Sequence, residues 1–354
     1  MGFMITFLIY KGIMCAAVFL ICLGAAAYAT LWERKFAAFL QDRKGPSRAG
    51  WGGILQPLAD GVKMFMKEEI IPNVSNRALF ILGPSLFMVT AVITSSVVPW
   101  AKPVNIGGQV YDMQITDINI GVIYLLGVAS IGVYGIMIGG WASNNKFALL
   151  GAVRASSQMI SYEIPMGIAL IALIISAGGS LSLKTIVEAQ DAGIANIVWQ
   201  PLGFLIFFIC ALAETNRAPF DLPECETELV GGYHTEYSSM KLGLFLFAEY
   251  INMFISSAVI ATLYFGGYNF PFAHELYAKL GLADGSVWIS LIGFGALMTK
   301  IFGFICLFMW IRWTLPRFRY DQLMNLGWKT LLPLSLFNLL LTIVIEYLRG
   351  NIHF

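Results

Sequence analysis

The chain has 354 residues, of which 58% are hydrophobic and 12% are charged, and its mean hydropathy is +0.74. A water-soluble fold is excluded, because a chain this apolar cannot cover its surface with polar groups. The net charge of +1 does not indicate a nucleic-acid partner. We therefore expect an all-α polytopic membrane protein that is surrounded by lipids.

Runs of about 20 apolar residues predict transmembrane helices, since that length crosses the hydrocarbon of a bilayer. The fourth run contains Pro165, which predicts a kink near its start. No internal repeat is present, so we expect a single membrane domain over residues 1–354. The sequence contains about eight such runs, near residues 5–31, 79–100, 119–140, 159–177, 197–213, 242–266, 287–311 and 330–348.

Lysine and arginine residues gather in the loops that follow the first, third, fifth and seventh apolar runs. The positive-inside rule therefore predicts that these four long loops lie in the cytoplasm. An even number of crossings then places both termini on the outer, periplasmic side of a bacterial inner membrane.

The first of these loops contains a helical pattern, ILQPLADGVKMFMKEEI. Leu55, Leu58, Val62, Phe65 and Met66 share one face at helical spacing, whereas charged residues fall largely on the other. This pattern predicts an amphipathic helix that starts near Pro57 and lies in the membrane interface. It is either a surface anchor or one wall of a portal for a lipid-soluble molecule.

Acidic residues gather directly behind the fifth apolar run, in ALAETNRAPFDLPECETELVGGYHTEY, residues 211–237. Carboxylates this close repel one another's ionised forms, so some should exchange protons near neutral pH. A purely structural interpretation is that Pro223 starts a short helix and that Glu224 and Glu226 complement the dipole of that helix. We predict that this stretch handles protons through acids that include Glu214, Asp221, Glu224, Glu226 and Glu228. Glu163 and Glu249, which lie within apolar runs, are further functional candidates.

One lysine, Lys300, falls near the middle of the seventh apolar run. A charge at that depth needs a partner, a water-filled cavity or a neutral state. Two readings stay open, a structural pair with a buried acid and a functional site.

Two basic loops mix arginine with aromatic residues, glycine and proline: LWERKFAAFLQDRKGPSRAGWGG and IRWTLPRFRYDQLMNLGWK. The simplest reading is a positive-inside anchor. However, Pro46 and Pro316 fix turns, and Gly50, Gly52 and Gly53 permit close approach of the backbone. We therefore predict a rigid docking surface for a soluble partner, which contains Arg43, Lys44, Arg48, Arg312, Arg317, Arg319 and Asp321.

Cysteine and histidine do not show the spacing of metal ligands. No CxxC pair is present, and the histidines His234, His274 and His353 lie far apart. Haem and structural metal sites need closer ligand pairs. We expect no redox metal, flavin or haem in this chain.

Four segments together resemble the H subunit of respiratory complex I, the NADH:quinone oxidoreductase, whose mitochondrial counterpart is NADH dehydrogenase subunit 1. The resemblance covers nearly the whole chain and lies on all four predicted cytoplasmic loops. The segments are ERKFAAFLQDRKGPSRAGWGGILQPLADGVKMFMKE, LLGAVRASSQMISYEIP, AETNRAPFDLPECETELVGGYHTEYSSMKLGLFLFAEY and FMWIRWTLPRFRYDQLMNLGWK.

The resemblance implies a translocase subunit that reduces no substrate alone but builds the site where ubiquinone or menaquinone is reduced. The quinone channel would be lined by Trp32, Arg34 and Lys35. The seven acids named above would couple quinone reduction to proton pumping. Implied partners are other membrane-arm subunits and the quinone-proximal iron–sulfur and 49-kDa-type subunits of the soluble arm.

Two alternatives remain at this stage. One is the matching membrane subunit of membrane-bound hydrogenases or formate hydrogenlyases, which shares these loops. The other is a secondary transporter, but the sequence shows no inverted repeat.

The apolar run 119–140 contains no acidic residue, so any proton relay through that run would need water or a neighbouring subunit.

Overall fold

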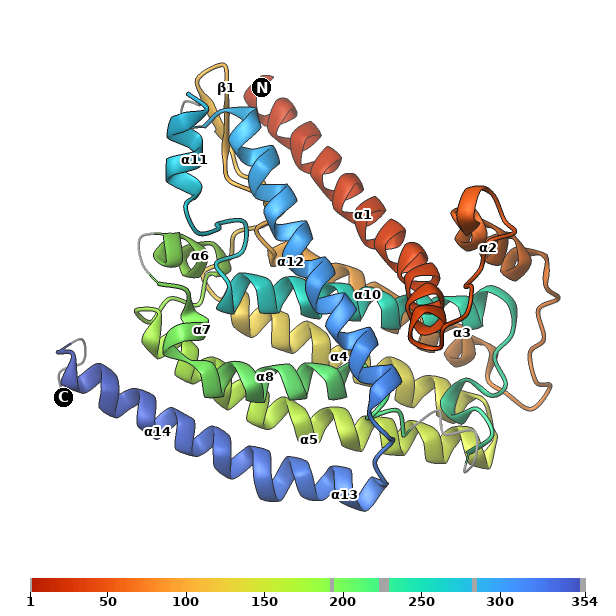
Figure 1. Ribbon diagram of the computed structural model, residues 1–354. Helices are drawn as coiled ribbons and strands as arrows, with labels where there is room; N and C mark the ends of the chain where they lie inside the picture. Colours follow the sequence, from red (N-terminus) through yellow and green to blue (C-terminus); the bar gives the residue numbers. More distant parts are fainter. Residues whose placement is uncertain (1, 192–193, 223–228, 282–284, 351–354) are drawn as a thin grey trace.

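The computed structural model describes residues 2–191, 194–222, 229–281 and 285–350, and it confirms the prediction of an all-α polytopic membrane protein (Figure 1). Seven helices among the described residues are long and apolar enough to cross a membrane. They are α1 Gly2–Leu40, α3 Arg77–Thr94, α4 Gly121–Ala142, α5 Lys146–Ser176, α10 Ser239–Tyr264, α12 Val287–Thr314, and a last helix formed by α13 Tyr320–Asn325, a π-helical turn Leu326–Leu331 and α14 Leu332–Leu348.

The fifth predicted span, 197–213, differs from a single membrane-crossing helix. It consists of α7, Asn196–Trp199, and α8, Pro201–Glu214, which are separated at Gln200. The 14 residues of α8 extend about 21 Å, which is shorter than the hydrocarbon core of about 30 Å. Gln200 is buried and its side chain bonds to Thr342 and Asn338 of α14, so tertiary polar contacts hold the break in place.

Both ends of the described chain lie at the same end of the helix bundle. In α1, Lys11 Nζ donates to the carbonyls of Gln114 and Ile115, just after the hairpin of β1, Val104–Ile106, and β2, Gln109–Tyr111. At the end of α14, the guanidinium of Arg349 lies 3.9 Å from the ring centroid of Trp199 in α7. Short helices α6, Leu183–Asp191, and α11, Ala273–Lys279, also lie at this end, which we call the hairpin end (Figure 1).

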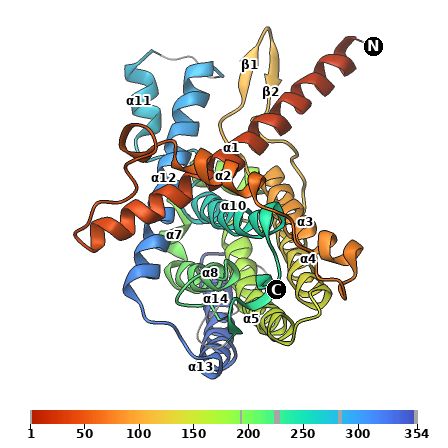
Figure 2. The ribbon, with the colours of Figure 1, turned by 90° about the vertical axis from the view of Figure 1, so that its right-hand side faces the viewer.

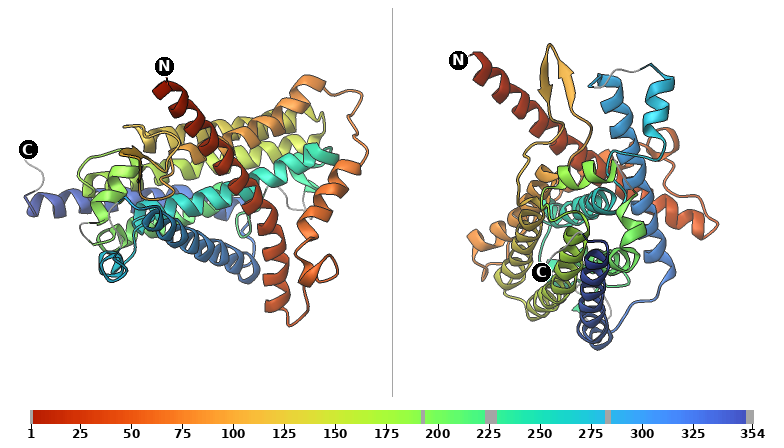
Figure 3. Two further views of the ribbon diagram at one scale, coloured as in Figure 1. Left: turned by 90° about the horizontal axis from the view of Figure 1, so that it is seen from above. Right: turned by 90° about the vertical axis from the view of Figure 1, so that its left-hand side faces the viewer.

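Two helices cross the bundle obliquely. The views agree that α1 and α12 slant across the other helices, whereas α4, α5, α8 and α14 run roughly side by side (Figure 2 and Figure 3). With 39 residues, α1 is about 58 Å long, so it must tilt or project from a bilayer. This slant separates α1 from α12 at one end and opens space between them.

Two elements begin earlier than the hydropathy predicted. Helix α5 starts at Lys146 rather than near residue 159, because Asn145 caps it by accepting a hydrogen bond from Phe147 N. The last helix starts at Tyr320 rather than near residue 330. Both added segments contain charged residues and project toward the opposite end of the bundle, which we call the loop end. Glu163 therefore lies well inside a helix of 31 residues.

Helix α10 forms the centre of the bundle, packed against α1, α3 and α12. On its α3 side, α3 and α4 approach so closely that a Cβ atom on Gly83 would lie 2.8 Å from Gly139 Cα. Small residues at such contacts let membrane helices pack backbone to backbone. This packing fixes the positions of the acids that α5, α8 and α10 contribute.

Candidate functional site

A largely buried set of polar and charged side chains joins four segments of the chain at the loop end. Glu33, near the end of α1, is 6% exposed. Its Oε2 lies 2.7 Å from Arg217 Nη1 and accepts a 2.9 Å hydrogen bond from Tyr250 OH, while its Oε1 accepts from Arg312 Nη1. The Arg217 guanidinium also lies 3.8 Å from the centroid of the Tyr250 ring. We call these four residues the Glu33 cluster, in which two cations face one carboxylate.

Asp221 lies four residues after Arg217 on the loop that follows α8, and it is 3% exposed. Its Oδ2 accepts a 2.9 Å hydrogen bond from Arg317 Nη2. Burial raises the pKa of Asp221 to about 6, because the positive charge of Arg317 offsets only part of the burial and Glu249 adds to the rise. An acid with this pKa can bind and release a proton near neutral pH.

The loop after α12 packs directly on the loop that carries Asp221. Phe318 N donates a 3.2 Å hydrogen bond to Pro219 O, and the ring centroids of Phe318 and Phe220 lie 5.5 Å apart. On its other side, Phe220 contacts the buried ring of Tyr162 in α5 at 5.7 Å. The predicted docking loop and the predicted acidic loop are therefore one packed unit.

Glu249 lies in α10 and is buried beside a short 3-10 turn, η3, Gly232–His234. Its Oε1 accepts a 2.6 Å hydrogen bond from Tyr233 OH. Burial lowers the pKa of His234, although the charge of Glu249 acts in the opposite direction, so His234 is neutral at physiological pH. A Cβ on Gly151 of α5 would lie 2.8 Å from Gly232 Cα, so glycine lets this turn sit tightly on α5.

In the structure, Glu163 lies close enough to Glu214 for its charge to act on the Glu214 carboxyl. Glu163 Oε2 accepts a 3.0 Å hydrogen bond from Ser130 of α4. Glu214, the last residue of α8, lines a cavity of about 30 Å³ whose walls also include Met166 and Asn252. A cavity of this size can hold at least one water molecule. Three other predicted acids, Glu224, Glu226 and Glu228, lie outside the described residues.

The amphipathic helix predicted near Pro57 is confirmed as α2, Gln56–Met66. Its apolar face, with Leu58 and Phe65, is exposed, as expected for a helix immersed in the membrane interface. Its polar face turns toward α1, where Asp60 Oδ2 lies 2.8 Å from Arg34 Nη1. Burial acts to raise the pKa of Asp60, but Lys63 and Arg34 lower it on balance.

Between α1, α2 and α10 lies a cavity of about 160 Å³, which we call the portal cavity. Arg34 lines it from α1, Asp60 and Lys63 line it from α2, and Phe247 and Tyr250 line it from α10. Because Tyr250 lines the portal cavity and also donates to Glu33, the portal cavity adjoins the Glu33 cluster.

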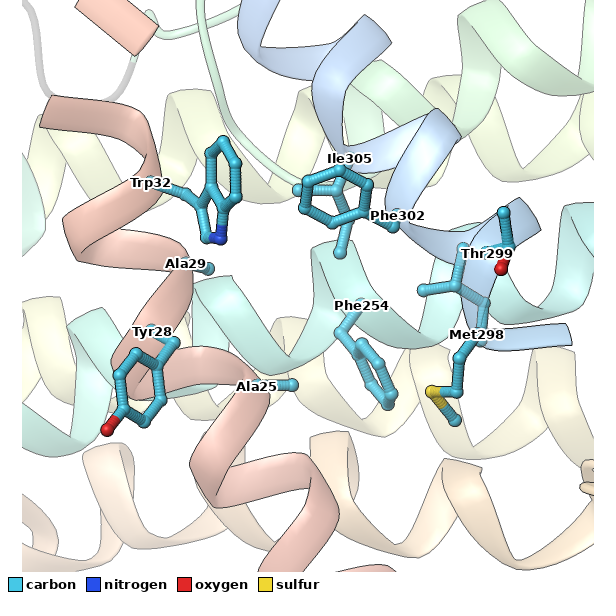
Figure 4. A pocket seen from close by; sticks show the side chains of 10 residues that line it. Ala25, Tyr28, Ala29, Trp32, Phe254, Met298, Thr299, Phe302 and Ile305 are labelled. Carbon is cyan, nitrogen blue, oxygen red and sulfur yellow. The ribbon is translucent and has the colours of Figure 1, made fainter. Parts of the chain in front are cut away.

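Trp32 faces a different cavity from Arg34. This second groove has a volume of about 420 Å³ and lies between α1, α10 and α12 (Figure 4). Trp32 of α1 and Phe302 of α12 contact each other edge to face at this groove, with ring centroids 4.8 Å apart, and Phe254 of α10 also lines it. Lys35 lines neither of these two cavities, and it packs against the turn at Gly45.

The predicted docking residues divide into two groups. Arg312 and Arg317 pair with the buried carboxylates of Glu33 and Asp221, although the Arg317 side chain itself is exposed. The turn near Gly53 is as tight as predicted, since a Cβ there would lie 2.1 Å from Pro46 O. The other predicted docking residues are also exposed: Arg43, Lys44, Arg48, Arg319 and Asp321.

Lys300 does not pair with an acid in the contacts that the structure gives. Its Nζ donates to the carbonyls of Phe265 and Gly267 at 2.7 Å and also to Asn269 O. These carbonyls follow the end of α10, so Lys300 acts as a C-terminal cap of that helix.

No cluster of three or more His, Cys, Asp or Glu side chains in the described ranges has the arrangement of a metal site, and the expectation of no redox metal stays a prediction.

The fold and the site define a polytopic membrane protein with buried acids, arginines that face them, and a cavity beside an amphipathic helix. Residues 13–343 match the NADH dehydrogenase family. The chain is 62% identical over 338 residues to an H subunit of NADH-quinone oxidoreductase from Cytophaga hutchinsonii, covering 96% of this chain and 97% of that one. It is 57% identical over 336 residues to the H subunit from Flavobacterium johnsoniae, covering 95% of each, and 50% identical over 313 residues to NADH-quinone oxidoreductase subunit 8 from Rhodothermus marinus, covering 87% and 89%.

The chain therefore belongs to the NADH dehydrogenase family, as a membrane subunit of the H type found in respiratory complex I. With its membrane-spanning helices, it is an integral inner-membrane protein.

Sequence reasoning missed Glu33, Arg217 and Asp60 as site residues. In the sequence, Arg217 is only one of the positive charges of its loop, and Glu33 falls beyond the end of the first predicted span. One signal was present: Glu33 and Arg217 each closely follow an apolar run, so each must find a partner near the membrane surface.

Proposed function

We propose that this chain forms much of the quinone channel of a proton-pumping NADH:quinone oxidoreductase and couples quinone reduction to proton translocation. One observation carries the proposal: the portal cavity is lined by Tyr250, which bonds to Glu33, and Arg217 of the same cluster lies on the loop of Asp221. A lipid-soluble substrate that enters beside α2 would thus reach a cationic site next to titratable acids.

In this mechanism the hydrocarbon tail of the quinone lies among the apolar walls of the portal cavity. The head group approaches the guanidinium groups of Arg217 and Arg312, which stabilise negative charge on a reduced quinone. Arg34, paired with Asp60 at the mouth, guides the head group. Trp32 lies on the opposite face of α1 and contacts the hydrocarbon of the membrane there. Lys35 supports the turn at Gly45.

Reduction of a quinone to a quinol takes up two electrons and two protons. The electrons come from the iron–sulfur partner in the soluble arm, and negative charge appears before the protons arrive. Across about 10 Å, at an effective dielectric near 20, one such charge interacts with a carboxylate by ~1.7 kcal/mol, or a little over one pKa unit. Asp221, with a pKa of about 6, would therefore cross neutrality and take up a proton.

The proton then passes along the acids toward the membrane plane. Asp221 and its loop neighbours Glu224, Glu226 and Glu228 accept it, and Glu214 and Glu163 carry it between α8 and α5, with Glu249 beside the path. The small cavity at Glu214 has room for at least one water, and one water can bridge two carboxyl groups. The other membrane-arm subunits receive the signal beyond α4 and α5.

This mechanism requires the loop end to face the cytoplasm, where the soluble arm docks, and both termini to face the periplasm. The excess of basic residues in the loops at that end supports this orientation. The exposed residues Arg43, Lys44, Arg48, Arg319 and Asp321 form the surface on which the soluble arm rests.

Charge removal without change of shape tests the acid path. Glu163→Gln and Glu214→Gln are introduced into the complete complex, which is reconstituted into vesicles. Proton translocation should fall at least tenfold, and quinone reduction should fall with it because the steps are coupled. Reduction of ferricyanide by the soluble arm should be unchanged.

Glu346→Gln is the matched control, because Glu346 is also a buried glutamate but bonds to Arg349 at the hairpin end. If both path variants pump and turn over like the parent complex, Glu163 and Glu214 are structural and the path is wrong.

A further inference from the structure

Gln158 is a fully buried amide of α5 that lies beside the loop between Glu214 and Asp221. Its Nε2 donates to Ala213 O at 2.8 Å and to Phe220 O at 2.9 Å, and it lies 3.3 Å from Asn216 Oδ1. All three partners are oxygen acceptors. The orientation of the amide is thereby fixed, because the opposite orientation would place its own oxygen against them.

The two carbonyls bonded to Gln158 have a shared property. Ala213 O belongs to the peptide bond that leads into Glu214, and Phe220 O belongs to the peptide bond that leads into Asp221. One side chain therefore ties together the two backbone positions from which these acids extend. Between them, Asn216 has a φ of +50°, a conformation that non-glycine residues adopt when the surroundings hold it.

The side-chain oxygen of Gln158 is in a less favourable environment than the side-chain nitrogen. Gln158 Oε1 is buried and has no hydrogen-bond partner within the described part of the chain. A buried acceptor without a partner is destabilising, and a hydrocarbon side chain of similar size would avoid it. Packing alone therefore does not account for glutamine at this position, whereas the two bonds to the loop do.

We propose that Gln158 is a positioning residue for proton transfer: its amide clamps both ends of the loop and so sets the distance between the carboxyl groups of Glu214 and Asp221. Proton transfer depends steeply on such distances, because the donor and acceptor must reach hydrogen-bond contact directly or through one water. This inference rests on the proposed function, since it assumes that both acids carry protons.

Without the clamp, the loop should loosen and water should reach Asp221. The groups that face Asp221 are Arg317 and Arg312 from the α12 side, Glu249 from α10 and Arg217 from its own loop. Burial is the main cause of its raised pKa, so hydration should lower that pKa. The acid side of the pH–rate profile should then move to lower pH.

Gln158→Leu in the complete complex is the direct test, and Ser157→Ala is the matched control, because the Ser157 hydroxyl donates to Val153 O in its own helix. In membranes, amide hydrogen exchange over residues 214–222 should become about tenfold faster in Gln158→Leu. Proton translocation per assembled complex should fall at least threefold, and the acid limb of the pH–rate profile should move down by at least half a pH unit. Ser157→Ala should leave all three unchanged.

Gln158→Glu keeps the size of the side chain and provides a second test if the leucine variant assembles poorly. A protonated carboxyl can donate one hydrogen bond to a loop carbonyl, whereas an ionised carboxylate repels both. The glutamate variant should therefore pump near the parent rate at low pH and lose activity as pH rises. A packing role would give a uniform loss of assembled complex at every pH.

The proposal is overturned if Gln158→Leu assembles with the exchange pattern, pH profile and pumping of the parent complex. Asp221→Asn separates this outcome from failure of the proposed function. If Asp221→Asn abolishes pumping while Gln158→Leu changes nothing, only the clamp is wrong. If Asp221→Asn also pumps normally, the acid path itself is wrong.

Discussion

Glu33 Oε2 lies 2.7 Å from Arg217 Nη1, although 184 residues separate the two in the chain. The pair joins the end of α1 to the loop that carries Asp221, and both side chains are buried. Arg312 and Tyr250 complete the cluster from α12 and α10. Three transmembrane helices and the acidic loop are thus connected through one carboxylate.

Replacement of Glu33 by glutamine should leave Arg217 and Arg312 without their countercharge. Breaking a buried ion pair by removing one partner costs about 3–5 kcal/mol in soluble proteins, so less assembled complex should remain after mild heating. Quinone reduction by the assembled fraction should fall, whereas ferricyanide reduction should persist. Glu69→Gln is a control, because Glu69 is an exposed partner of Lys241. Normal heat resistance of the Glu33 variant would contradict the stabilising role of the cluster.

Arg319 and Arg317 should give different results when each is replaced by glutamate. Arg319 is exposed, so Arg319→Glu should weaken docking and release the soluble arm into the supernatant on sedimentation. Arg317 pairs with Asp221 at 2.9 Å, so Arg317→Glu should also place two carboxylates together and change the pH profile of the acidic loop. Retention of the soluble arm by Arg319→Glu at high salt, with full activity, would exclude Arg319 from the docking surface.

Local patterns in the sequence predicted the helices well. Hydropathy located seven membrane-crossing helices among the described residues, and periodicity located α2, because both signals depend only on neighbouring residues. The break at Gln200 was not predicted, since it is held by Thr342 and Asn338 about 140 residues away.

The site was predicted only in part for the same physical reason. Glu163, Glu214, Asp221 and Glu249 could be found as acids next to apolar runs. The Glu33 cluster could not, because the burial of Glu33 depends on α1 continuing to Leu40 and on partners from distant segments. The proton-handling role of all these acids stays a prediction, and Glu224, Glu226 and Glu228 lie outside the described residues.

Asp221 should make the stability of its loop depend on pH. Its pKa is raised by burial from 3.8 to about 6, so the folded loop binds a proton more tightly than the unfolded chain. This contribution is fully present below pH 3.8 and is lost as pH rises through about 6. Protection of residues 214–222 from hydrogen exchange, corrected for intrinsic rates, should therefore decrease between pH 4 and pH 7. Asp221→Asn should remove this dependence, and a persistent dependence would assign it to another group.

Lys300→Met should destabilise the hairpin end of the bundle. The substitution leaves the carbonyls of Phe265, Gly267 and Asn269 without their charged donor, and unsatisfied buried acceptors cost about 1–3 kcal/mol. Heat inactivation of the complex should become faster, while the apparent KM for quinone stays constant. Lys279→Met, an exposed lysine of α11, should have no effect. A changed KM with normal heat resistance would instead indicate a functional role for Lys300.

Arg34 and Asp60 offer a test of the route by which quinone enters. Their side chains meet at 2.8 Å across the mouth of the portal cavity, so each can be removed without disturbing the Glu33 cluster. Arg34→Met should raise the apparent KM for quinone about three- to tenfold and leave ferricyanide reduction unchanged, because a cation that guides the head group is lost. Asp60→Asn frees Arg34 from its partner and should lower or preserve KM.

Arg77→Met replaces an exposed arginine at the start of α3 and controls for loss of positive charge at the membrane surface. If Arg34→Met and Arg77→Met raise KM equally, the effect belongs to surface charge, and if Arg34→Met lowers quinone and ferricyanide reduction together, the variant is misassembled. A rise in KM confined to Arg34→Met would place the path of the quinone between α1 and α2, on the opposite side of α1 from the groove at Trp32.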